Sequence, residues 1–136
     1  MQGLHLTADA SGCPTDAAAL REPPALRALC LAAVAEAGLT PVGELFHRFD
    51  ATVGGGGVTG VVLLAESHLA VHTWPELAAV TLDVYVCNFG ADNSERAERL
   101  MGALLAALLP ASVDRQQLRR GRLPGAGHAG KVTDAS

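Results

Sequence analysis

Between Leu63 and Glu76 the chain reads LLAESHLAVHTWPE, and the rest of the sequence is organised around this stretch. Its apolar residues surround an acid, a hydroxyl and two imidazoles. Buried polar groups are costly unless something satisfies them, so this concentration of polar side chains needs a reason. A hydroxyl nucleophile with a base nearby is the minimal set for attack on a carbonyl, and Ser67 supplies the hydroxyl.

Alternating and helical hydrophobic patterns predict the elements on either side of this stretch. Helical spacing predicts one helix from Pro24 to a stop at Gly38 and a second from Asp92 to Pro110. Alternation predicts six strands, at 3–9, 41–50, 58–64, 69–74, 80–87 and 112–120. This order predicts an α+β fold, a two-layer sandwich in which two main helices cover one face of a mostly antiparallel sheet.

Three local patterns add detail to this expectation. Asp92 and Glu95 form a capping-box-like pair that predicts the start of the second helix. The glycines at 54–57 lack the Lys-Ser/Thr that a phosphate-binding loop needs, so we interpret them as a flexible hairpin connection. In the strand 80–87, alternation places Asp83 and Cys87 on the same side.

Composition narrows the class of protein. With 136 residues, 49% of them hydrophobic and 18% charged, the chain is expected to be one folded domain. A net charge of −4 and few aromatic residues argue against nucleic acid as a partner. No apolar run approaches a membrane span, and no signal peptide is evident. Three cysteines without metal-type spacing indicate a cytoplasmic protein with reduced thiols.

Simpler explanations of the central histidines fit the sequence less well than a functional site. His68 and His72 share a face and could bind a metal, but no third ligand accompanies them, so we expect no metal. Ser67 lacks the flanking glycines of a hydrolase nucleophile elbow. A lone histidine on an apolar strand is usually a satisfied core group. The crowding of polar groups between Glu66 and Glu76 favours a functional site instead.

The segment Ala65–Glu76 resembles the processing motif of the small prokaryotic S-adenosylmethionine decarboxylases, which are pyruvoyl enzymes of polyamine synthesis. Four further segments match at that family's spacing, and together they extend the resemblance over roughly residues 3 to 122. These segments are Gly3–Leu6, Phe46–Phe49, Thr59–Val62 and the pair Asp83 and Cys87.

The resemblance implies that the chain is a zymogen that cuts itself. Ser67 would attack the carbonyl of Glu66, and elimination and hydrolysis would leave a pyruvoyl group in place of the serine. His72 is implied as the base of this processing, and Thr59 as the hydroxyl that helps hold the ester. The products would be a β-chain, 1–66, and an α-chain, 67–136, in a decarboxylase domain over 1–122 followed by a flexible tail at 123–136.

The same resemblance implies a carboxy-lyase that makes the aminopropyl donor for spermidine. A Schiff base between S-adenosylmethionine and the pyruvoyl group would make that group an electron sink. Cys87 is implied as the proton donor, and Glu76 as the acid that binds the ribose. Phe49 would stack on the adenine opposite His72 and come from a partner subunit, which implies a homodimer.

Two departures from the family pattern leave the substrate open. The segment Leu77–Val80 lacks tyrosines that some relatives carry, and Asn88–Gly90 stands where glycine usually follows the cysteine. The nearest alternative is a pyruvoyl-dependent ornithine or arginine decarboxylase, and another is a non-processing paralogue that acts by binding an active subunit. Cys30 is expected to pack in a helix core, and Cys13 receives no role.

Overall fold

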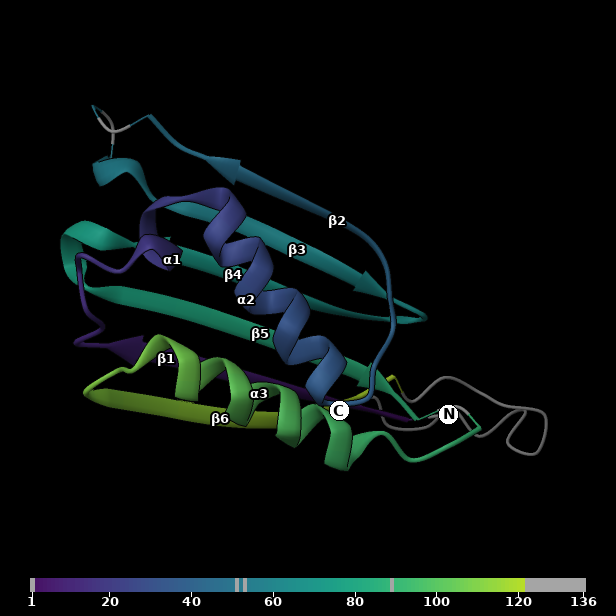
Figure 1. The fold of residues 1–136 in the computed structure, drawn as a ribbon. Helices are drawn as coiled ribbons and strands as arrows, with labels where there is room; N and C mark the ends of the chain where they lie inside the picture. The colour runs from purple at the N-terminus through teal and green to yellow at the C-terminus, as the bar shows by residue number, and fades with distance from the viewer. Residues whose placement is uncertain (1, 51, 53, 89, 122–136) are drawn as a thin grey trace.

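The strands form one six-stranded sheet in the order β2-β3-β4-β5-β1-β6, and every neighbouring pair is antiparallel (Figure 1). The computed structural model describes residues 2–50, 52, 54–88 and 90–121. The strands are β1 (Gly3–Ser11), β2 (Pro41–Arg48), β3 (Val58–Leu64), β4 (Ser67–Trp74), β5 (Ala79–Cys87) and β6 (Ser112–Arg120).

Two long helices cover one face of this sheet (Figure 1). They are α2 (Pro23–Glu36), which packs on β2 and β3, and α3 (Ser94–Leu108), which packs on β1 and β5. The shorter elements are α1 (Ala18–Arg21) and the 3₁₀ turns η1 (Gly54–Gly56) and η2 (Pro75–Leu77). The predicted α+β sandwich is therefore confirmed.

The core lies between the helices and the sheet. Alternate residues of the central strands point to the helices and are fully buried, among them Val62, Leu69, Val71 and Val84. A buried hydroxyl ties this layer together, because Thr73 Oγ1 accepts from the Val58 N–H (2.8 Å) and donates to the Leu20 carbonyl (2.8 Å). The intervening residues of each strand face away from the helices, so His68, His72 and Trp74 of β4 lie on the helix-free face.

The structure corrects two local predictions. Ser67 and His68 belong to β4 itself rather than to a connection, so only Ala65 and Glu66 lie between β3 and β4. Helix α3 begins at Ser94 with Asn93 at its N-cap, so the predicted capping box is wrong. Asp92 instead accepts the Ser94 N–H (2.9 Å), and this bond lowers the pKa of the Asp92 carboxyl.

The ends of the elements otherwise follow the sequence closely. β3 and β6 have the predicted bounds, whereas β1 runs two residues further, from the predicted Asp9 to Ser11. The tail predicted for residues 123–136 lies outside the described part of the chain. Among the described residues, no helix is long and apolar enough to cross a membrane.

Candidate active site

The tightest turn of the sheet lies immediately before Ser67. Leu64 pairs with Ser67 across β3 and β4, so Ala65 and Glu66 alone reverse the chain. Glu66 adopts a left-handed backbone conformation, with φ of 56°. A residue with a Cβ atom pays about 1–2 kcal/mol for this conformation, because the Cβ crowds the following carbonyl. The peptide that joins Glu66 to Ser67 therefore starts from a strained position.

The serine lies against the end of β5. Ser67 Oγ accepts a hydrogen bond from the Cys87 N–H at 3.1 Å, and Cys87 Sγ lies 3.9 Å from Glu66 Oε1. The Cys87 side chain is almost buried, with Cys87 only 7% exposed. We call Glu66, Ser67 and Cys87 the serine half-site.

A polar network fixes the chain after Cys87, and the sequence did not reveal it. Asn93 Nδ2 donates to the Cys87 carbonyl (2.9 Å), while the Asn93 N–H donates to Asn88 Oδ1 (2.8 Å). Asn88, which stood out as a departure from the family pattern, thus ties the end of β5 to the start of α3. These bonds hold Cys87 in register beside the serine.

A second group of predicted site residues lies at the other end of β4. Thr59 Oγ1 and His72 Nδ1 are 3.0 Å apart across the β3–β4 ladder, and the Trp74 ring lies 6.0 Å from the imidazole. These side chains line a hollow of about 310 Å³. Its lining consists of Phe49, Gly57, Thr59, His72, Thr73, Trp74 and Glu76. We call Phe49, Thr59, His72, Trp74 and Glu76 the imidazole half-site.

The glycine run shapes this hollow, so the interpretation as a merely flexible connection is incomplete. A Cβ on Gly57 would collide with the Thr73 carbonyl, and one on Gly55 would collide with the Glu76 carboxylate. The Phe49 N–H donates to the Gly57 carbonyl (2.8 Å), which closes the loop. The glycines therefore allow the loop to bring Phe49 and Glu76 to the same hollow.

The two half-sites are separated within one chain. Ser67 and His72 are five residues apart on β4, and a strand rises about 3.3 Å per residue, so their backbones are about 17 Å apart. A hydrogen bond spans about 3 Å, so one copy cannot bring this imidazole to its own serine. The role of His72 as the processing base stays a prediction that needs a second copy of the chain.

The remaining cysteines contribute no chemistry to these groups. Burial raises the pKa of the Cys30 thiol to about 12 and also raises the pKa of the Cys13 thiol. Cys30 is fully buried on α2, as predicted from its helical position. In the part of the chain that the structure describes, no group of three His, Cys, Asp or Glu side chains is placed to hold a metal ion.

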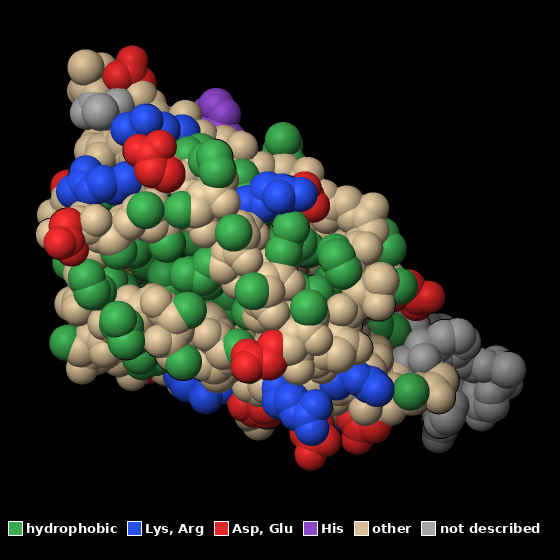
Figure 2. Space-filling model, viewed as in Figure 1, with side chains coloured by type: hydrophobic (Ala, Val, Ile, Leu, Met, Phe, Trp, Pro, Cys, Tyr) green, Lys and Arg blue, Asp and Glu red, His purple; other side chains and the backbone are tan. Residues whose placement is uncertain are grey.

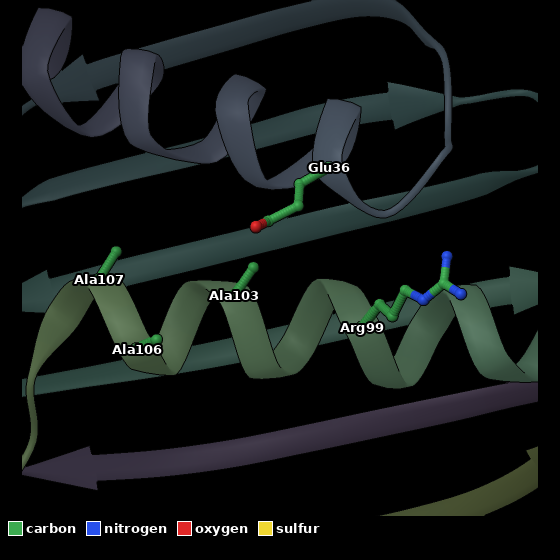
Figure 3. A pocket seen from close by; sticks show the side chains of 5 residues that line it. All are labelled: Glu36, Arg99, Ala103, Ala106 and Ala107. Carbon is green, nitrogen blue, oxygen red and sulfur yellow. The ribbon is translucent and has the colours of Figure 1, made fainter.

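A larger hollow, of about 660 Å³, lies on the helical face and is separate from both half-sites. Figure 2 shows this face, with hydrophobic side chains gathered between the helices, and Figure 3 shows the lining. The side chains around it are Glu36, Arg99, Ala103, Ala106 and Ala107. These side chains lie on α2 and α3, whereas the residues of both half-sites lie on strands or on their connections.

The fold first defines a structural class. A crystal structure of the adenosylmethionine decarboxylase from Aquifex aeolicus VF5 aligns with a TM-score of 0.77 at 36% identity, covering 89% of this chain and 92% of that one. The chain therefore has the fold of this adenosylmethionine decarboxylase, an antiparallel sheet with helices on one face.

The family follows from sequence comparison. A family model described as S-adenosylmethionine decarboxylase matches residues 4–121, and the chain belongs to this family. An S-adenosylmethionine decarboxylase proenzyme from Aquifex aeolicus is 39% identical over 88% of this chain and 81% of the relative. One from Picrophilus torridus is 35% identical over 88% of this chain and 84% of the relative. The resemblance found in the sequence is confirmed.

The strain at Glu66 generates a test with a matched pair of variants. Glu66→Ala keeps a Cβ atom and hence the strain, whereas Glu66→Gly removes both. If strain promotes cleavage before Ser67, the glycine variant will be cut about fivefold more slowly than the alanine variant, because its precursor lies about 1 kcal/mol lower. Gel analysis of cleavage after cell-free synthesis measures both rates. An equal or faster rate for Glu66→Gly would contradict a contribution of strain.

Proposed function

We propose that this chain is a self-processing, pyruvoyl-dependent S-adenosylmethionine decarboxylase, a carboxy-lyase. The observation that carries the proposal is the serine half-site, in which a hydroxyl directly follows a left-handed non-glycine residue and lies beside a cysteine. Membership of a family whose relatives are named proenzymes supports the same conclusion.

The first reaction is the cut between Glu66 and Ser67. Ser67 Oγ attacks the Glu66 carbonyl carbon, and the Glu66–Ser67 amide becomes an ester with a free amine on residue 67. Removal of the Ser67 α-proton then expels the Glu66 carboxylate and leaves dehydroalanine. Water adds at that residue, ammonia leaves, and a pyruvoyl group caps the α-chain at position 67.

The residues around position 67 suit such a group. The Cys87 N–H already donates to the serine side chain, and the Cys87 thiol is largely withdrawn from solvent. When formed, the pyruvoyl group supplies an electron sink for loss of carbon dioxide from an amino acid. Cys87 then delivers the proton to the substrate carbon.

The imidazole half-site suits the adenosyl part of the substrate. Phe49 is 48% exposed and lines the hollow together with His72 and Trp74, so flat rings are available to an adenine. Glu76 offers a carboxylate that can accept hydrogen bonds from ribose hydroxyls. The pair Thr59 and His72 can hold the ester and remove the α-proton of the serine.

Both halves act on one substrate only if two copies share their sites. Helix-free sheets of two copies that face one another across a two-fold axis can bring the end of β4 that carries residue 67 in each copy to His72 of the other, because such contacts are reciprocal. The helix-free face also exposes apolar side chains that a second copy can cover, with Leu45 70% and Leu63 49% exposed. We infer a homodimer with two shared active sites.

The substrate is tested by carbon dioxide release. Processed protein is offered S-adenosylmethionine, ornithine or arginine, with Ser67→Ala as the blank. We expect release above the blank with S-adenosylmethionine alone, and Cys87→Ala should still be cut but lose most turnover. Release with ornithine or arginine instead would contradict the substrate, and unchanged turnover of Cys87→Ala would remove this thiol from the donor role.

The shared site is tested by complementation. We expect Ser67→Ala and His72→Ala each to remain uncut when expressed alone. When the two are co-expressed, mixed dimers contain one complete site, and about half of the His72→Ala chains should be cut. Mass spectrometry distinguishes the two chains. If the His72→Ala chain stays intact in the mixture, or is cut alone, the two copies do not share the site in this way.

A further inference from the structure

A chain of hydrogen bonds ends at the residue that follows Ser67, and the proposed reaction does not use it. Arg120 Nη1 on β6 lies 3.1 Å from His5 Nδ1 on β1. His5 Nε2 lies 2.6 Å from Asp83 Oδ1 on β5, and His68 Nε2 on β4 lies 3.3 Å from the same oxygen. We call Arg120, His5, Asp83 and His68 the His68 anchor.

The donors and acceptors of this anchor run in one direction. A guanidinium has no acceptor, so Arg120 donates to His5 Nδ1, and the proton of the His5 ring is on Nε2. That N–H donates to Asp83, whose oxygen also accepts from His68 Nε2. The Arg120 guanidinium is itself held over the Tyr85 ring, 5.0 Å from its centre. Four strands of the sheet thereby fix one imidazole.

The anchor gains importance once the chain is cut. In the precursor, the covalent turn through Glu66 holds residue 67 in place. After the cut, residue 67 is a chain end, and the hydroxyl that accepts from the Cys87 N–H is consumed. Ends of chains fray unless they are tied down. The ladder between β3 and β4 reaches residue 67 through its pair with Leu64, whereas the ladder between β4 and β5 starts only at the pair His68 and Tyr85. On the β5 side, where Cys87 lies, the His68 side chain is therefore the tie next to the new end.

We propose that Arg120, His5 and Asp83 are positioning residues that act through His68 to hold the cut end of the α-chain beside Cys87. The proposal rests on the proposed cut before Ser67. It separates the two reactions of the protein, because the covalent turn positions Ser67 for the cut whereas the anchor positions residue 67 for turnover.

The test compares Asp83→Asn with wild type and with Glu98→Gln. Glu98→Gln is the matched control, since it removes a carboxylate that pairs with Arg115 (2.8 Å) on the helical face. We expect all three proteins to be cut to the same extent. In Asp83→Asn, kcat should fall about 10–100-fold, as for other supporting residues, with KM changed less than threefold. His5→Phe leaves the contact between Asp83 and His68 in place and should therefore give a smaller loss of kcat.

A second readout does not depend on activity. Hydrogen exchange, read by mass spectrometry on peptides that begin at residue 67 of the cut protein, should be about tenfold faster in Asp83→Asn than in Glu98→Gln. Slow hydrogen exchange in β1 and β5 shows that a variant is folded. If Asp83→Asn is not folded, the same exchange measurement on His5→Phe tests the anchor.

The outcomes separate this inference from the proposed function. The anchor would be overturned if the folded Asp83→Asn and His5→Phe variants had the same kcat and the same exchange rate as wild type. It would also be overturned if Asp83→Asn folded but was not cut. An uncut wild-type protein would overturn the proposed function. A cut wild type that releases no carbon dioxide from S-adenosylmethionine would refute the substrate, and the exchange measurement would still decide on the anchor.

Discussion

A two-residue connection joins β3 to β4, and it can do so only because Glu66 adopts a left-handed backbone. The ladder on either side holds this conformation in place, from Leu64 paired with Ser67 onward. The sheet therefore holds strain in the backbone of Glu66, the residue whose carbonyl group precedes Ser67. The same register places Ser67 against Cys87, so the group to be formed and its proposed proton donor are set by one turn.

Strand geometry also explains why the active site is incomplete in one copy. The strand carries Ser67 and His72 to its opposite ends, and alternation turns their side chains to opposite faces, because they are five residues apart. The helices cover one face of the sheet (Figure 1), so in the proposed homodimer a second copy lies against the bare face and joins the halves. In that proposed dimer, assembly and catalysis would be one requirement, because the bare face would form the contact and also carries the imidazole half-site.

Sequence patterns predicted the sheet and its faces well, because alternation directly reports burial: Val84 is fully buried, while its neighbours Asp83 and Tyr85 are only partly buried. The site residues were predicted through the resemblance to a family. The separation of the two half-sites was not predicted, because spacing along a strand does not show which copy supplies a group. The contacts of Gly57 with Thr73, and the bonds from Arg120 through His5 to Asp83, join distant segments and leave no local signal.

The central claim is that Ser67 itself cuts the chain and becomes the pyruvoyl group. Intact mass spectrometry of the purified protein tests it most directly. The account predicts two chains, 1–66 with a free carboxylate and 67–136 lighter than a serine-ended chain by the mass of one ammonia. A single chain of 136 residues, or an α-chain that retains an N-terminal serine, would contradict it.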